Sequence, residues 1–270
     1  EYFLEQEKRL NVKYILDKFK TNYIFTKEEL EKIERIKVDY RHLIRRLSRA
    51  QLKDVFDRFT ANFTYESNAI EGNSLTLKDV SIVIFENSIP RGKDLREIYE
   101  TRNSRIVLDM ILKKKVDIVH KNIIKIHKIL MKDIDARTGY KKIPNLIIGS
   151  SIKTTPPEKV VEEMTKLIDW YNSNLGKTHP LELVTNFHGR FEKIHPFEDG
   201  NGRVGRFLIN VILVNNGYPP LIIRKTVRKS YMSALSAFDF GYEDKLKRLL
   251  LEKYKETYKK FFEVYVRYAK

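Results

Sequence analysis

Apolar residues recur every three or four positions along most of the chain, and this spacing predicts an amphipathic helix wherever it is sustained. It predicts helices over about 51–71, 95–113, 118–131, 157–174, 180–193 and 203–216, with two more helices after Pro219–Pro220. Residues 1–50 also have helical spacing, but charges crowd both sides of a narrow apolar stripe that contains Leu30, Ile33 and Ile36. We therefore expect this part to be an appendage without a deep core.

Capping residues and glycines mark where helices begin and end. Thr76 and Asp79 have the capping-box spacing of a helix start, and Gly72 can end the preceding helix in the left-handed conformation. Residues 137–157 differ from the rest because glycines and prolines alternate there with apolar residues and threonines. This pattern predicts a short β-hairpin at about 144–155. The expected fold is therefore an all-α bundle with one small hairpin.

Composition narrows the class of protein. The chain has 270 residues, of which 42% are apolar, enough for a substantial core, and it has no cysteine, which excludes disulfides and cysteine-based sites. No apolar run is long enough to span a bilayer and no signal pattern opens the sequence, so we expect a cytoplasmic protein. The net charge of +16 attracts phosphates, of nucleotides or of nucleic acid, although a lysine-rich solvated surface explains it equally well.

Residues 195–206 read HPFEDGNGRVGR and join two of the predicted helices. The glycines at 200 and 202 let the backbone approach a ligand closely and turn its N–H groups inward. The helix that follows begins at once, and its free N–H groups and positive dipole end form an anion site. Arg203 and Arg206 are three residues apart, so they lie on one helical face and can reach the same polyphosphate.

Two further residues of this loop complete a set for phosphate chemistry. Asp199 offers the carboxylate oxygen that a phosphate-bridging Mg²⁺ requires. His195 can remove a proton near neutral pH, and Phe197 is expected to anchor the loop in the core. Together these residues indicate transfer of a phosphorus-containing group to a hydroxyl, with catalysis by positioning and charge stabilisation.

The pattern His-x-Phe-x-Asp/Glu-Gly-Asn-Gly-Arg-x-x-Arg is the Fic motif, and residues 195–206 match it at every defined position. The chain thus resembles the Fic (filamentation induced by cAMP) family, and the order of helices and hairpin extends the resemblance over roughly 50–240. The resemblance implies a Fic-type helical bundle in which a short β-hairpin forms a flap over the active site.

By this resemblance the chain transfers AMP from Mg-ATP to a Ser, Thr or Tyr hydroxyl of a target protein, and pyrophosphate leaves. His195 would be the general base and Asp199 the Mg²⁺ ligand. The nucleotide would contact Gly200, Asn201, Gly202, Arg203 and Arg206. Doc relatives, which phosphorylate their target, usually have lysine at the position of Gly202, so this glycine favours AMP transfer. Some Fic relatives use other nucleotides or CDP-choline, and the donor is therefore left open.

A second motif lies N-terminal to the loop. Ser67 and Glu71 are four residues apart, share a helical face and precede Gly72, so they match the family's inhibitory motif Ser/Thr-x-x-x-Glu-Gly/Asn. The resemblance implies that the helix at about 55–71 is inhibitory and that Glu71 pairs with Arg206 at the γ-phosphate position. In some relatives the same glutamate supports removal of AMP, so a second activity is left open.

The remaining site residues follow from the same resemblance. An extended target segment would add to the edge of the flap at 144–155, where Ile147 and Ile148 would clamp it. Tyr231 falls where relatives often place a residue near the adenine, although packing is the alternative for all three side chains. The flap stretch has Lys141 and Lys142 after Tyr140, where an arginine is expected.

The division into parts and the partners complete the expectation. Residues 1–50 would form a helical appendage, 51–240 the Fic core and 241–270 a C-terminal helix. The partners would be ATP and a protein target, which includes the chain itself, and no membrane; a homodimer is left open. The alternatives are a basic nucleic-acid-binding regulator, for which no helix-turn-helix or RNA-binding signature is found, and a structural protein with a decayed core.

Overall fold

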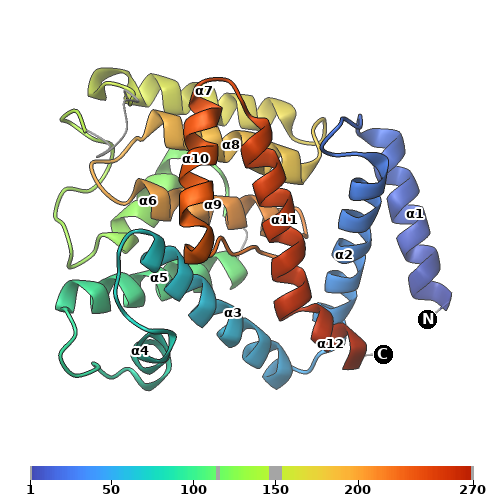
Figure 1. Ribbon diagram of the computed structural model, residues 1–270, viewed down its shortest axis with the longest axis horizontal. Coiled ribbons are helices and arrows are strands. Elements are labelled where there is room, and N and C mark those ends of the chain that lie inside the picture. Colours follow the sequence, from blue (N-terminus) through green and yellow to red (C-terminus); the bar gives the residue numbers. More distant parts are fainter. Residues whose placement is uncertain (1, 114–115, 146–153, 269–270) are drawn as a thin grey trace.

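The computed structural model describes residues 2–113, 116–145 and 154–268, and it is helical (Figure 1). The elements are α1 (Tyr2–Lys18), α2 (Lys27–Arg46), α3 (Arg49–Ile70), α4 (Leu77–Ser81), η1 (Ile82–Glu86), α5 (Leu95–Lys113), α6 (His120–Leu130), η2 (Pro157–Lys159), α7 (Val160–Asn174), α8 (Pro180–Ile194), α9 (Asn201–Asn215), η3 (Lys225–Val227), α10 (Arg228–Asp239), α11 (Asp244–Phe261) and α12 (Glu263–Tyr268). The described ranges contain no strand, so the predicted all-α fold is confirmed.

The predicted hairpin falls mostly on residues that the structure does not describe. Residues 146–153, with Ile147 and Ile148, lie outside the described residues. The described ends of the segment, at 144–145 and 154–155, have no regular secondary structure.

Helix α9 forms the centre of the bundle. Every residue from 203 to 213 is buried, including the polar side chains of Arg203, Arg206 and Asn210. It contacts α3, α5, α6 and α8, and Figure 1 shows it in the middle of the view among these helices. Asn210 fixes the chain after α9, because its side chain accepts from the N–H of Leu221 at 2.8 Å and donates to the same residue's carbonyl at 3.1 Å. The helix that begins at the glycine-rich loop is therefore held on several sides, and the chain that follows it is fixed by Asn210.

The first fifty residues contribute more to the core than their sequence pattern indicates. Leu30 and Ile33 of α2 are fully buried, and Tyr40 packs edge-on against Phe262. Buried Glu34 ties the same helix to the start of α8, because its Oε1 lies 2.8 Å from His179 Nε2. The expectation that this region lacks a deep core is wrong, because the narrow stripe of α2 meets residues from the other end of the chain.

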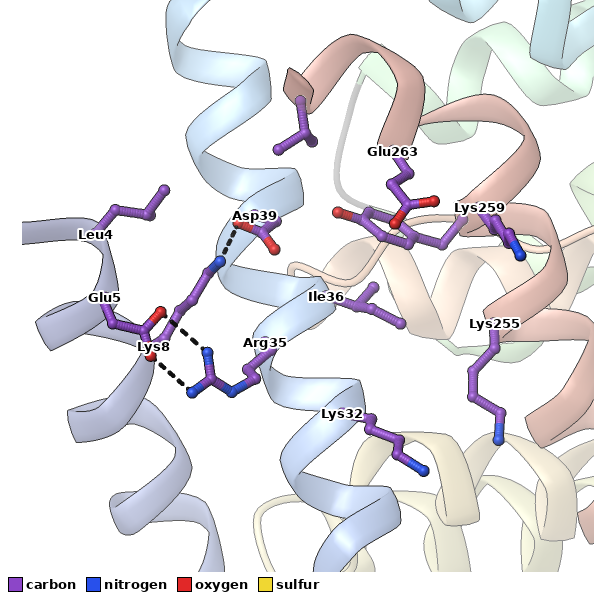
Figure 2. A pocket seen from close by; sticks show the side chains of 12 residues that line it. Leu4, Glu5, Lys8, Lys32, Arg35, Ile36, Asp39, Lys255, Lys259 and Glu263 are labelled. Atoms are coloured by element: carbon purple, nitrogen blue, oxygen red, sulfur yellow. Dashed lines mark hydrogen bonds and ion pairs between the residues drawn. The ribbon is translucent and has the colours of Figure 1, made fainter. Parts of the chain in front are cut away.

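A groove of about 660 Å³ lies between α1, α2 and the C-terminal helices (Figure 2). Figure 2 shows Glu5 and Lys8 of α1 reaching toward α2. Arg35 donates to the Glu5 carboxylate with both terminal nitrogens, at 3.1 and 2.7 Å, and Lys8 pairs with Asp39 at 2.7 Å. These charges join the first two helices. No helix of the described ranges has both the length and the apolar character required to cross a bilayer.

Candidate active site

His195 directly follows α8 and has a left-handed backbone, with φ 53° and ψ 60°. This conformation costs a non-glycine residue about 1 kcal/mol, and it turns the chain from α8 into the loop. The Nδ1 atom lies 3.3 Å from the carbonyl oxygen of Glu192. Because a carbonyl only accepts, Nδ1 carries the proton and Nε2 is left as the basic atom.

The environment keeps this imidazole neutral. Burial, with a smaller effect of the Lys141 ammonium, lowers the pKa of His195 to about 4. At neutral pH the ring is therefore uncharged, with its one proton on Nδ1, and Nε2 is able to accept a proton.

The loop after His195 is fixed by its own side chains. Asn201 accepts from the N–H of Phe197 at 2.8 Å and donates to its carbonyl at 2.7 Å. Phe197 is fully buried and stacks on His127 with ring centroids 3.9 Å apart, so its predicted anchoring role is confirmed. His127 Nε2 donates to the carbonyl of Asp199 at 3.1 Å. Both polar groups of the Asn201 side chain are thus used within the loop. The group of Asn201 that remains available to a phosphate is its backbone N–H.

The start of α9 forms an anion site. Gly200 precedes the helix with φ 81°, and the first intrahelical bond runs from Val204 N–H to the Gly200 carbonyl at 3.0 Å. The N–H groups of residues 201–203 therefore have no partner within the helix. A Cβ at Gly202 would overlap Glu71 Oε1, so only glycine lets this carboxylate lie against the helix start. A negatively charged group already occupies the place expected for a phosphate.

Arg206 is 2% exposed and joins α9 to the end of α3. Its Nε donates to Ser67 Oγ at 3.0 Å, and its Nη2 donates to the Ser67 carbonyl at 2.9 Å and to Glu71 Oε1 at 2.6 Å. The predicted pair between Glu71 and Arg206 is thus present. Within the described part of the chain Arg206 Nη1 has no hydrogen-bond partner, which leaves one buried donor for a ligand.

Arg203 is similarly buried, at 3% exposed, and lies on the side of α5. Its Nη1 is 3.2 Å from Glu100 Oε1. Neither Nε nor Nη1 makes a well-directed hydrogen bond to any described residue. Two buried guanidinium groups with unused donors therefore face the turn between α8 and α9.

Asp199 lies at the open side of the loop with 44% of its side chain exposed. Its Oδ1 accepts from the N–H of Gly200 at 2.6 Å, and its Oδ2 accepts from Arg96 Nη2 at 2.9 Å. No cluster of three metal-ligating side chains occurs among the described residues. Mg²⁺ normally takes only one or two carboxylates and completes its shell with phosphates and water, so a single accessible carboxylate fits such an ion.

Comparison with known proteins shows which family the chain resembles. A sequence model of the Fic/DOC family matches residues 117–213. The chain is 32% identical to protein adenylyltransferase Fic of Drosophila melanogaster over 182 residues and 29% identical to protein adenylyltransferase fic-1 of Caenorhabditis elegans over 188 residues. Each alignment covers 66% of this chain, but only 37% and 36% of the relatives, so the chain spans little more than a third of their length.

Solved structures agree with this match. A Fic domain containing signaling protein from Bacteroides thetaiotaomicron superposes with a TM-score of 0.77 at 26% identity, over 88% of this chain and 97% of that one. Residues 134–508 of C. elegans Fic-1 superpose with a TM-score of 0.75 at 24% identity, over 87% and 70% of the two chains, and so share the fold. The chain is thus similar to proteins of the Fic/DOC family in sequence over residues 117–213 and in fold.

Tyr231 lies in the interior of the protein rather than at its surface. It is fully buried, its hydroxyl is 2.7 Å from His188 Nε2, and the two rings are nearly parallel at 8°. The expectation of an adenine contact gains no support from this position. His188, 1% exposed, is an ordered core histidine as predicted.

A polar clasp beside the Fic loop was not found from the sequence. Lys141, which is 3% exposed, donates through Nζ to Asn145 Oδ1 at 2.8 Å and to Thr154 Oγ1 at 3.1 Å. Asn145 in turn donates to the Phe197 carbonyl at 2.8 Å. The two residues that bracket 146–153 are thus tied to the Fic loop, and burial lowers the pKa of Lys141 to about 8. Lys141, Asn145 and Thr154 belong to no motif, so the sequence did not indicate that they contact one another.

Glu192 is a second residue that sequence reasoning missed. Its Oε1 lies where a Cβ at Gly205 would be, and 4.0 Å from His188 Nδ1. Burial raises the pKa of Glu192 to about 8, so the carboxyl is largely protonated at neutral pH. A signal was present in this case, because His188, Glu192 and His195 share one helical face by spacing.

Proposed function

We propose that this chain transfers AMP from Mg-ATP to a hydroxyl group of a protein, and that Glu71 holds it in an inhibited state. The observation that carries the proposal is the buried Arg206 at the start of α9, which pairs with a carboxylate from α3 and keeps one donor unused. The names of the Drosophila and C. elegans relatives, protein adenylyltransferases, support the choice of AMP. Gly202 favours it too, because the Doc relatives that phosphorylate usually have lysine there.

The phosphates of ATP would lie at the start of α9. Arg203 and Arg206 would hold the β and γ phosphates with the N–H groups of residues 201–203, since helix N-termini and forked guanidinium groups both favour phosphate. Asp199 would hold Mg²⁺, which when bound neutralises charge on the phosphates. The burial of both arginines makes these contacts stronger than they would be in water.

His195 would act on the incoming hydroxyl. The Nε2 atom accepts the hydroxyl proton while the oxygen forms a bond to the α-phosphorus, and the bond from that phosphorus to the bridging oxygen breaks. Pyrophosphate leaves with the electron pair of the broken bond. The low pKa of His195 supports this role because the ring enters the reaction uncharged, with Nε2 free to accept a proton.

Glu71 would inhibit by placing its negative charge at the position of the γ-phosphate. It lies 2.6 Å from Arg206 Nη2, and a phosphate at that nitrogen would meet the carboxylate charge. ATP that enters beside it would have a misplaced α-phosphate. Removal of AMP from the modified target, supported by the same glutamate, is a second reaction of this site within the proposal.

The target would bind at the segment 144–155. In the proposal this segment is a hairpin flap, an extended target strand pairs with its edge, and Ile147 and Ile148 clamp that strand. The bonds from Lys141 to Asn145 and from Asn145 to the Phe197 carbonyl tie the described start of this segment to the Fic loop. The target is a protein, which includes a second copy of this chain, and a cytoplasmic location with ample ATP and Mg²⁺ belongs to the same proposal.

Incubation with labelled ATP and Mg²⁺, followed by mass spectrometry, tests the function. We expect Glu71→Gly to raise auto-modification by about tenfold or more over the wild type, because Arg206 becomes free for phosphate. The isosteric Glu71→Gln, which removes the charge but keeps the side chain, should raise it less, and Glu71→Gly/His195→Ala should incorporate no AMP. Equal labelling of wild type and Glu71→Gly would remove the switch, and labelling of the His195 variant would remove the base. Salt-dependent DNA binding without any turnover would favour the nucleic-acid alternative instead.

A further inference from the structure

The two carboxylate oxygens of Asp199 have different partners. Its Oδ1 is held by the N–H of Gly200 at 2.6 Å, which fixes the orientation of the carboxylate. The Oδ2 atom is left for a cation. In this structure that atom accepts from Arg96 Nη2 at 2.9 Å, and Arg203 Nη2 lies farther away at 3.9 Å.

Arg96 reaches this oxygen from the first turn of α5. Its Nε also lies 3.4 Å from Glu100 Oε1, which is the carboxylate oxygen beside Arg203. The side chain is 56% exposed and its partner 44% exposed, in contrast to the buried Arg206. Ion pairs this exposed are weak and easily exchanged, because water screens them.

We propose that Arg96 is a positioning residue that holds Asp199 ready in the metal-free site and competes with the divalent metal for its Oδ2 atom. The inference rests on the proposed function, since it concerns the metal that accompanies ATP. One carboxylate oxygen cannot serve the guanidinium and the metal in full at once. The metal therefore displaces Arg96, and the cost of breaking that ion pair weakens the coupling between metal and nucleotide.

Two consequences follow from the charges around Asp199. Without metal, Arg96 neutralises the carboxylate and so reduces its repulsion of the phosphates. With metal, the guanidinium must be released before the ion can bind. Loss of Arg96 should thus weaken nucleotide binding without metal and favour it with metal.

The test measures nucleotide affinity and no turnover. A fluorescent derivative of α,β-methylene ATP is titrated with the full chain in the Glu71→Gly background, once with EDTA and once with Mg²⁺, and its anisotropy is followed. We expect the ratio of the two dissociation constants, EDTA over Mg²⁺, to be about threefold larger for Arg96→Gln than for the parent, the range of one exposed ion pair. Arg96→Lys should lie nearer the parent. Arg91→Gln removes one exposed positive charge from the turn before α5 and should leave the ratio unchanged.

The outcomes separate the inference from the function on which it rests. If Arg96 only holds α5 in place, Arg96→Gln weakens both affinities alike and the ratio stays constant, which overturns the inference alone. A smaller ratio in Arg96→Gln overturns it as well. If no variant binds the nucleotide under either condition, the proposed function falls, and this inference falls with it.

Discussion

Charged side chains join separate helices both in the groove beside α1 and in the Fic site, but they do so differently. In the groove, Arg35 gives both terminal nitrogens to Glu5, and this pair is 35% and 40% exposed. In the Fic site, Arg206 is 2% exposed and keeps Nη1 without a partner among the described residues. The groove pair satisfies its charges, whereas the site pair leaves a donor unused.

This difference shows where an anion belongs. A buried guanidinium with an unused donor is costly, and a protein tolerates it where a ligand completes the hydrogen bonds. An exposed and fully paired guanidinium has no such need, because water and its partner serve it. The groove is therefore a joint between helices, and the turn before α9 is a binding site.

Substitution of the two arginines is the strongest way to break this comparison. In the Glu71→Gly background we expect Arg206→Gln to lower AMP transfer by about a hundredfold or more, the usual cost of a lost charge-stabilising donor. Arg35→Gln removes the same charge from the groove and should change transfer by less than about twofold. Circular dichroism checks that both variants fold. Comparable losses in the two variants would contradict the distinction between site and joint.

The pKa values of two carboxyl groups, Glu192 near the site and Glu5 in the groove, shift in opposite directions and give a second, smaller contrast. Burial raises the pKa of Glu192 to about 8, so the folded state holds a proton that the unfolded chain loses above its ordinary pKa of 4.5. Stability therefore falls as the pH rises from about 4.5 to 8. Glu192→Gln lacks this titrating carboxyl. We therefore expect its free energy of unfolding, relative to that of the wild type, to be higher at pH 9 than at pH 5 by a few kcal/mol, the order of magnitude of such a pKa shift. Urea unfolding at the two pH values measures the gain.

Glu5 is the matched control for this contrast, and its sign is opposite. Hydrogen bonding to Arg35 lowers the pKa of Glu5, so its charged form stabilises the fold above its ordinary pKa, and this contribution is lost in acid. Glu5→Gln should thus lose a little stability at neutral pH. A pH-independent difference between Glu192→Gln and the wild type would show that the Glu192 carboxyl is not protonated in the fold.

Local features of the sequence were sufficient for most of the fold and for the centre of the site. The helices at 95–113 and 180–193 were found from spacing alone, because each buries one face along a continuous segment. The Fic loop was found for a similar reason, since its glycines, His195 and the two arginines stand within twelve residues. The pair of Glu71 with Arg206 needed the resemblance, because 135 residues separate them.

Contacts between distant segments were not accessible in this way. Arg96 lies 103 residues before Asp199 on a helix whose charges look like any solvated face. The stripe of α2 seemed too narrow for a core because its partners, such as Phe262, come from the far end of the chain. Tyr231 was placed by analogy near the adenine, whereas its side chain turns inward to His188. The direction in which a side chain points, and the residue that it contacts, depend on tertiary packing. A local sequence pattern does not encode that packing.

The crystal structure of Glu71→Gly with α,β-methylene ATP and Mg²⁺ tests most directly whether the turn before α9 is a phosphate site. We expect a phosphate oxygen within hydrogen-bond distance of Arg206 Nη1 and of the N–H groups of residues 201–203, with His195 Nε2 facing the α-phosphorus. A structure in which the nucleotide binds elsewhere, and Arg206 Nη1 has no phosphate neighbour, would contradict the account.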